Sequence, residues 1–160
     1  MGDETGFAAE GGCTCGGVRY RLTAPPLFVH CCHCTWCQRA SGSAFATNIL
    51  IETARVTVLS GATVRTTAPS PSGRGQAFLR CPGCGVTLWS HYLRMGEHIA
   101  FVRAGTLEDP SVAPPDIHIY TSTKQPWVTL PDGVPAVPEY YRADEMWPAD
   151  SLARFAGALR

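Results

Sequence analysis

Seven of the eight cysteines in this 160-residue chain stand in three short clusters. The clusters have the spacings C-x-C, C-x-C-x-x-C and C-x-x-C, and they consist of Cys13 and Cys15, of Cys32, Cys34 and Cys37, and of Cys81 and Cys84. Thiolates this close in sequence can turn their sulfur atoms toward one Zn²⁺ about 2.3 Å away, whereas so short a spacing rarely permits an unstrained disulfide. The spacing therefore predicts metal binding.

Two of the clusters together supply four thiolates, the full ligand set of a closed tetrahedral zinc site. We expect one structural Zn²⁺ to be held by Cys13, Cys15, Cys81 and Cys84. Glycines follow both pairs directly, so that backbone amides can approach the sulfur atoms. The alternative is a set of reduced core cysteines, which the tight turn at Pro82-Gly83 disfavours.

The remaining cluster offers three thiolates, which leaves one coordination position for water or a substrate thiol and is typical of a reactive zinc. The ligands of this second Zn²⁺ would be Cys32, Cys34 and Cys37. Bound there, the ion would lower the pKa of a thiol and polarise an aldehyde oxygen. Two alternatives stay open. One is a redox-sensitive thiol cluster without metal, and the other is a fourth ligand from a distant histidine or from His33, His30 or Cys31.

Cys31 is the one cysteine outside the clusters. If the segment is extended, its side chain points away from that of Cys32, because successive residues of a strand face opposite sides. We interpret Cys31 as a spare buried thiol.

The elements that must position these thiols are mainly β-strands. Sixteen glycines and 13 prolines punctuate the chain, and the segments between them are short and rich in β-branched and aromatic residues. The expected strands are residues 18–22, 45–51, 55–59, 64–67, 76–80, 86–91, 98–103 and 117–121. Short helices are expected at 34–40, ended by Gly42, and at 150–156, capped by Asp150 or Ser151. The expected fold is mainly β, with several sheets and one or two short helices.

Length and charge limit the class of protein. A chain of 160 residues that is 45% hydrophobic suits one domain, which we expect over 1–160, with a motif core at 12–130 and a C-terminal coil and short helix at 131–160. The 13 basic and 13 acidic residues are scattered, so no surface for nucleic acid or an anionic membrane is expected. No apolar run reaches about 18 residues, and residues 1–6 carry no export or myristoylation signal. We expect a cytoplasmic protein with reduced cysteines, and the sequence does not predict its oligomeric state.

Six segments follow one another in a recognisable order. They are 12–20 (GCTCGGVRY), 32–42 (CHCTWCQRASG), 81–85 (CPGCG), 105–110 (GTLEDP), 115–119 (PDIHI) and 124–127 (KQPW). This order resembles that of the glutathione-dependent formaldehyde-activating enzyme (GFA) family, which includes centromere protein V-like zinc domains. The resemblance runs from residue 12 to about residue 130.

The resemblance implies a fold of several coiled antiparallel β-sheets held by zinc, with one structural ion and one labile ion of the catalytic type. It assigns the structural ion to the four cysteines of the C-x-C and C-x-x-C pairs, and the labile ion to Cys32, Cys34 and Cys37. It also implies a carbon–sulfur lyase activity like that of S-(hydroxymethyl)glutathione synthase. Such an enzyme adds a small thiol such as glutathione to formaldehyde or a related aldehyde, or reverses this addition.

A site for glutathione needs charged side chains near the three-cysteine cluster, because the molecule carries two carboxylates and an ammonium group. Arg39 is the best-placed cation, and the resemblance adds His118 and Lys124. One departure from the family bears on substrate: Arg80 stands directly before the C-x-x-C pair, where the family has Arg-x-Phe-Cys. In an extended strand this turns the guanidinium to the opposite face.

An alternative function is a non-catalytic zinc-binding module, or a carrier that binds thiols or aldehydes without turnover. Centromere protein V joins a GFA-like domain to a basic, disordered extension, and this sequence shows no such extension. Binding to chromatin or to the cytoskeleton is therefore disfavoured.

Overall fold

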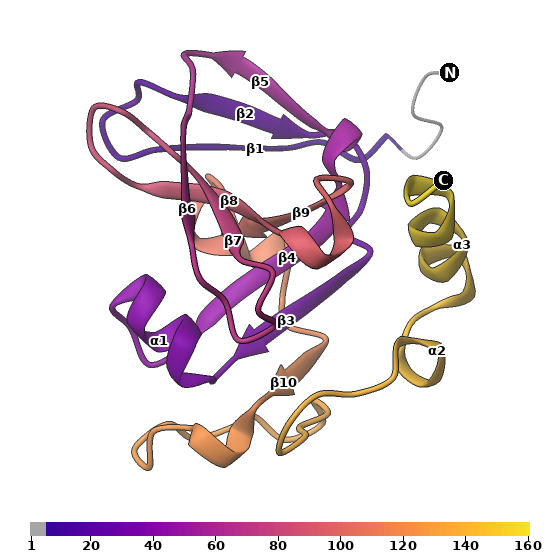
Figure 1. Ribbon diagram of the computed structural model, residues 1–160. Helices are drawn as coiled ribbons and strands as arrows, with labels where there is room; N and C mark the ends of the chain where they lie inside the picture. Colours follow the sequence, from indigo (N-terminus) through magenta and orange to yellow (C-terminus); the bar gives the residue numbers. More distant parts are fainter. Residues whose placement is uncertain (1–5) are drawn as a thin grey trace.

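The computed structural model describes residues 6–160, and the expectation about an export signal rests mostly on residues outside this range. Within the described residues, ten strands form two sheets (Figure 1), which confirms the expected mainly β fold. The strands are β1 (Ala9–Gly12), β2 (Arg19–Leu22), β3 (Phe28–Cys32), β4 (Ala46–Glu52), β5 (Val56–Ser60), β6 (Val64–Ala68), β7 (Gln76–Arg80), β8 (Thr87–Tyr92), β9 (Ile99–Arg103) and β10 (Ile117–Ile119).

The small sheet has the order β1-β2-β5, and the large sheet has the order β10-β3-β4-β9-β8-β7-β6. All neighbouring strands are antiparallel except β10 and β3, which pair in parallel. This single parallel pair brings residues 117–119 beside residues 30–32, although nearly 90 residues separate them in sequence.

Helices are short and lie outside the sheets. They are α1 (Thr35–Ser41), α2 (Ala143–Met146) and α3 (Ala149–Ala158), and the 3₁₀ helices are Thr53–Arg55, Leu93–Met95, Ala104–Thr106, Pro110–Val112 and Thr121–Thr123. Figure 1 shows the segment after β10 running along the lower edge of the molecule and ending in α3 beside the sheets. Across residues 6–160, none of the helices combines the length and apolarity that a membrane span requires.

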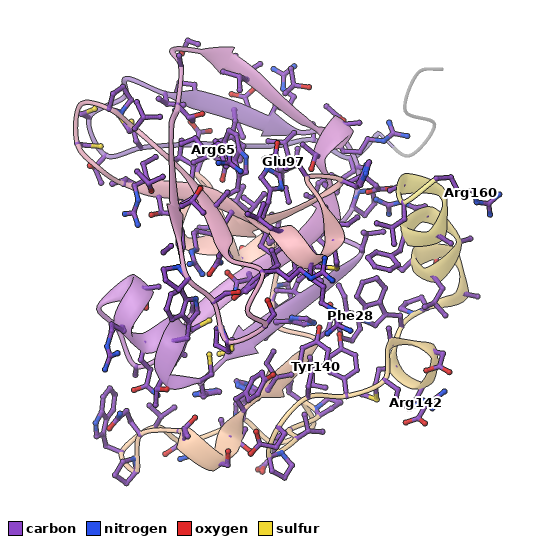
Figure 2. All side chains as sticks on the ribbon, viewed as in Figure 1. Phe28, Arg65, Glu97, Tyr140, Arg142 and Arg160 are labelled. Atoms are coloured by element: carbon purple, nitrogen blue, oxygen red, sulfur yellow. The ribbon has the colours of Figure 1, made fainter. Side chains whose placement is uncertain are left out.

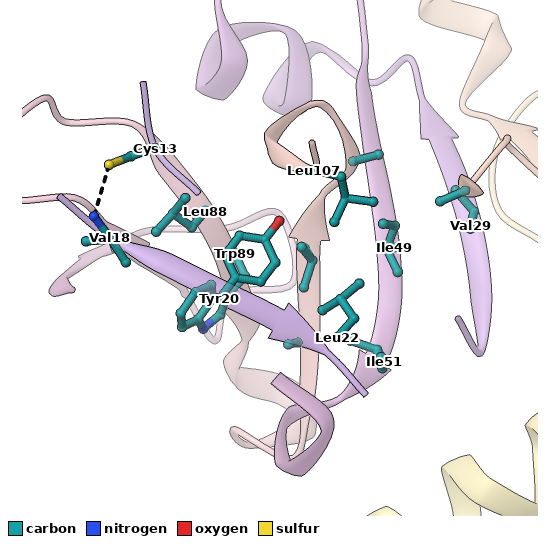
Figure 3. Packing of buried hydrophobic residues seen from close by; sticks show 14 of the residues in the cluster. Cys13, Val18, Tyr20, Leu22, Val29, Ile49, Ile51, Leu88, Trp89 and Leu107 are labelled. Carbon is teal, nitrogen blue, oxygen red and sulfur yellow. Dashed lines mark hydrogen bonds between the residues drawn. The ribbon is translucent and has the colours of Figure 1, made fainter. Parts of the chain in front are cut away.

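The first hydrophobic core lies between the two sheets. Tyr20 and Leu22 of β2 pack toward Ile49 and Ile51 of β4, and Trp89 of β8 meets the Tyr20 ring edge-on at 5.7 Å (Figure 3). Alternate residues of β2 are buried, because one face of the small sheet covers the large sheet and the other faces solvent.

The second core lies on the opposite face of the large sheet, under the C-terminal segment. Phe28 of β3 stacks on Trp147 at 5.5 Å, and Trp147 contacts Phe155 of α3. Arg154 of α3 donates two hydrogen bonds to the carboxylate of Glu52, at 2.9 and 2.7 Å. Figure 2 shows Phe28 and Tyr140 on this covered side. Because both faces of the large sheet are covered, its central strands are apolar on both sides.

Three elements escape prediction from sequence: β1, β3 and α2. The strand β1 contains Gly11, where a Cβ would lie 2.5 Å from the carbonyl oxygen of Thr106 and 2.7 Å from the Tyr20 ring, so close packing rather than strand propensity selects the residue. The strand β3 is buried at every position and carries His30 and two cysteines, so it shows neither alternation nor high β-propensity. The helix α2 lies in a proline-rich stretch that the sequence suggests is coil.

Candidate metal centres and pocket

The four cysteines of the C-x-C and C-x-x-C pairs converge at one end of the small sheet. The sulfur atoms of Cys13, Cys15, Cys81 and Cys84 all lie within 4.8 Å of one another. The Sγ–Sγ distance is 3.6 Å from Cys15 to Cys13 and 3.6 Å from Cys15 to Cys81. Two sulfurs bound to one tetrahedral Zn²⁺ stand about 3.8 Å apart, so the four positions fit the ion.

Two similar turns position these sulfurs. The backbone N–H of Gly16 donates to the carbonyl of Cys13, and that of Gly85 donates to the carbonyl of Cys81. Both glycines have φ of 75°, a left-handed conformation that favours glycine. The turns aim backbone N–H groups at sulfur, as in the 3.2 Å contact from Val18 N to Cys13 Sγ (Figure 3).

The same turns stabilise a thiolate. A backbone hydrogen bond from Val86 and a side-chain hydrogen bond from Thr14 lower the pKa of Cys84 to about 5. A deprotonated sulfur is the form that binds zinc. The charge and geometry of this site therefore suit a cation bound by four sulfurs, although Cys15 and Cys84 are exposed.

The three-cysteine cluster lies where β3 ends and α1 begins. Cys32 is the last residue of β3, Cys34 is the N-cap of α1, and Cys37 lies within the helix. The Sγ atoms of Cys32 and Cys34 are 3.4 Å apart, and the Cys37 backbone N–H donates to Cys34 Sγ at 3.3 Å. The helix ends at Gly42, whose φ of 68° is left-handed, as the sequence predicts.

Without a cation, one of the three thiols ionises readily, and its negative charge opposes ionisation of a second. Hydrogen bonds from Cys32 and Cys37 lower the pKa of Cys34 to about 3. The hydrogen bond with Cys34 in turn raises the pKa of Cys32. A divalent cation would remove this limit by binding all three sulfurs as thiolates, so the donor set fits zinc.

These three cysteines line a pocket of about 540 Å³. Other parts of its wall are Asn48 of β4, Tyr92 at the end of β8, Arg94, and Tyr120 and Tyr140 from the C-terminal segment. Figure 2 shows sulfur atoms gathered beside α1 and, separately, beside the loops near the small sheet. A second cavity, of about 390 Å³, lies between Glu52 and α3 and has no cysteine in its wall.

The surroundings fix the orientation of one polar side chain of the pocket and the protonation state of another. Arg103 donates a hydrogen bond to the Oδ1 of Asn48, which orients that amide. Burial, reinforced by the charges of Cys37 and Cys32, raises the pKa of Tyr92, so its phenol stays protonated. Both side chains can therefore donate hydrogen bonds to a ligand beside the sulfurs.

The three residues predicted for substrate do not line this pocket. Arg39 is exposed on α1, and the Nζ of Lys124 donates to the carbonyls of Gln125 and Val128 at 3.1 and 2.7 Å. His118 is buried against His33. Their role in binding substrate stays a prediction. Arg94 is the arginine that lines the pocket, and no motif in the sequence marks it.

The alternative fourth ligands also take other positions. Within residues 6–160, no further cysteine, histidine or carboxylate joins the three sulfurs to form a larger group. His30 lines the same pocket, but its Nε2 is 2.6 Å from the Tyr141 hydroxyl. Cys31 and His33 lie instead with His118 in a separate group.

The chain was compared with known proteins. The sequence profile of the glutathione-dependent formaldehyde-activating enzyme family matches residues 8–123. A crystal structure of a Rhodobacter sphaeroides protein matches at 21% identity and a TM-score of 0.47, covering 62% of this chain and 87% of that one. A search of curated proteins gives no match. Because the family profile spans well over half of the sequence, the chain belongs to the glutathione-dependent formaldehyde-activating enzyme family.

Proposed function

We propose that this protein is a zinc-dependent carbon–sulfur lyase-type enzyme that adds a small thiol such as glutathione to formaldehyde or a related aldehyde, and reverses this addition. Membership of the family supports a formaldehyde-activating or related glutathione-dependent function. The observation that carries the finer proposal is the three-cysteine cluster, which offers three thiolates to a pocket large enough for a small peptide thiol.

We propose two zinc sites with different roles. Cys13, Cys15, Cys81 and Cys84 surround a structural ion with four sulfurs, and this closed set leaves no position for substrate. Cys32, Cys34 and Cys37 supply three sulfurs and leave one position open toward the pocket. Bound there, zinc would keep a substrate thiol as thiolate at neutral pH and polarise the aldehyde.

Residues of the pocket position the two reactants. The guanidinium of Arg94 binds a carboxylate of the thiol substrate, because it is the arginine in the pocket wall. The Asn48 amide, oriented by Arg103, donates to the aldehyde oxygen, and the protonated Tyr92 phenol provides a second donor. The thiolate sulfur bonds to the aldehyde carbon, the carbonyl π electrons move to oxygen, and that oxygen takes up the proton that the thiol released to solvent.

Exchange NMR tests this proposal directly. Mixing protein, glutathione and formaldehyde is expected to accelerate adduct exchange above the uncatalysed rate, and Cys34→Ser is expected to abolish the acceleration. The control is Ser43→Ala, an exposed change that follows α1 and touches none of the three sulfurs. No acceleration by the zinc-loaded wild type would refute the enzyme. Capture of one equivalent without turnover would instead identify a carrier.

We also propose one domain and a reducing compartment. The motif core at 12–130 and the segment 131–160 share the second hydrophobic core, and Arg154 of α3 pairs with Glu52 of β4. All eight cysteines are free thiols, and thiols persist in a reducing cytoplasm. Limited proteolysis is expected to spare the junction near residue 130, and early release of the C-terminal segment would argue for two units.

A further inference from the structure

A third group of metal-binding side chains lies in the large sheet, apart from the two cysteine clusters. Cys31, His33 and His118 are all buried, and their ligand atoms lie within 4.8 Å of one another. Cys31 Sγ is 3.6 Å from His33 Nε2, which is 3.0 Å from His118 Nδ1. We propose that these three side chains bind a Zn²⁺ ion of their own.

The strand pairing brings the three donors together. Cys31 lies on β3, and His33 stands two residues further on the same face of the extended segment. The parallel pairing of β10 with β3 places His118 directly opposite Cys31. The backbone N–H of His33 donates to the carbonyl of Ile119 at 3.0 Å, which continues this pairing beyond the end of β3. The convergence is thus fixed by the backbone.

The observed distances fit the ion. On a tetrahedral Zn²⁺ bound by one sulfur and two nitrogens, the S···N separation is about 3.6 Å and the N···N separation about 3.3 Å. The corresponding distances in the structure are 3.6 Å and 3.0 Å, and the ligand atoms of all three residues lie within 4.8 Å of one another. One thiolate and two imidazoles form a donor set that zinc prefers and that Mg²⁺ and Ca²⁺ do not.

Burial of these groups requires compensation. Among the described residues, His33 Nδ1 and His118 Nε2 have no hydrogen-bond partner although both are buried. A hydrogen bond between the two rings uses only one nitrogen of each and leaves a donor and an acceptor unpaired, a cost that apolar side chains would avoid. Zinc would bind the two nitrogens that face each other, His33 Nε2 and His118 Nδ1, in place of their hydrogen bond. Its bonds to them and to Cys31 would offset the cost of burying the two outer N–H groups. The Cys31 thiol releases its proton to solvent, and its thiolate and the two neutral imidazoles bind the ion.

The ion would also fix part of the pocket. β10 has only three residues, and it pairs with β3 at the end of the large sheet's strand order. Ile119 and Tyr120, directly after His118, line the pocket that holds the three-cysteine cluster. Zinc between His118 and Cys31 therefore ties this wall to β3, although the ion itself lies on the other face of the sheet.

Native mass spectrometry after reconstitution with zinc chloride counts the ions on each folded chain. Cys31→Val is expected to carry one ion fewer than wild type. The matched control is Val29→Ala, because Val29 is equally buried on the same face of β3, two residues before Cys31, and offers no ligand atom. Its zinc content is expected to equal that of wild type. Equal zinc content in Cys31→Val and wild type would overturn the proposal.

Two further measurements separate this site from the proposed active site. In a Cys34→Ser background, Cys31→Val is again expected to remove one ion, and an unchanged count there would overturn the proposal whatever the fate of the three-cysteine site. Zinc X-ray absorption of wild type needs no variant to fold. It is expected to show imidazole ligands, because the two cysteine clusters offer only sulfur, and ligation by sulfur alone would exclude the third site.

Discussion

Loss of the four-cysteine site should destabilise the protein by an amount that follows from its topology. Cys15 and Cys81 are 66 residues apart in sequence, with their sulfurs 3.6 Å apart, so an ion that binds both acts as a cross-link. Closing a loop of that length removes unfolded-state entropy worth about 4 kcal/mol at 25 °C. For a domain of this size, 1 kcal/mol corresponds to about 3 °C in Tm. Cys81→Ser is therefore expected to lower the Tm by about 12 °C.

Differential scanning calorimetry with and without chelator isolates this contribution. Both proteins carry Cys34→Ser, so that the three-cysteine cluster does not contribute a full site. Chelation is expected to lower the Tm of the parent by about 12 °C more than that of the Cys81→Ser variant, since the latter has lost the cross-link already. The matched control is Gly83→Ala in the same turn, where the new Cβ would lie 3.5 Å from Cys15 Sγ, an ordinary contact distance.

Two results would contradict this stabilising role of zinc. If elemental analysis shows that the chelator has removed the zinc and the Tm of the parent does not change, the four sulfurs hold no stabilising ion. If Gly83→Ala lowers the Tm as much as Cys81→Ser does, the conformation of the turn, and not the zinc ligand, is responsible for the stability.

Three further predictions concern single side chains. Arg94→Gln is expected to raise KM for glutathione about tenfold, because one charged hydrogen bond is lost. KM for the uncharged thiol 2-mercaptoethanol is expected to stay the same. A larger effect from Arg39→Gln would show that Arg39 of α1, and not Arg94, binds the carboxylate. Tyr20→Phe removes the 2.7 Å hydrogen bond to Thr106 Oγ1 and should cost about 1 kcal/mol at pH 7 by urea denaturation. Burial raises the pKa of Tyr20 to about 12, so wild type should lose stability from pH 10 to 12, where only the unfolded chain ionises this phenol; a variant with the same alkaline slope would contradict this. Gln76→Leu unpairs Trp36 Nε1 and Ser90 Oγ and should cost about 1–3 kcal/mol by the same assay, and no change would mean that water replaces the amide.

Local chemistry predicts much of the fold. Strands such as β7 and β9 appear where short apolar segments lie between turns, and α1 ends at Gly42 as expected. Pairing over long distances is what the sequence does not reveal. From sequence alone Gly11 of β1 suggests a loop, because the close packing of the Tyr20 ring against it is visible only in the structure. β10 is recognisable as extended, but nothing local indicates that its partner is β3 and that the pair is parallel.

The same division holds for the candidate site. The grouping of seven cysteines into a set of four and a set of three follows from ligand spacing, and the structure places both sets within ligand distance. The cation of the pocket could not be found in this way. Arg94 follows β8 in the 3₁₀ helix Leu93–Met95, and the fold brings this helix to the wall of the pocket that the three cysteines line. Arg39, close to Cys37 in sequence, points elsewhere because it lies on the exposed side of α1.

The stretch His30 to Cys34 shows how one extended segment can serve two sites. Its even-numbered residues, His30, Cys32 and Cys34, line the pocket, and its odd-numbered residues, Cys31 and His33, meet His118 on the other side. Side chains of a strand alternate between faces, so a shift of one residue in pairing would exchange the two donor sets. The register of β3 with β4 and β10 is therefore under chemical as well as hydrophobic constraint. Cys31 is buried, as predicted. In the proposed third site it is a ligand rather than a spare thiol, because the alternation that turns it away from one set of donors turns it toward another.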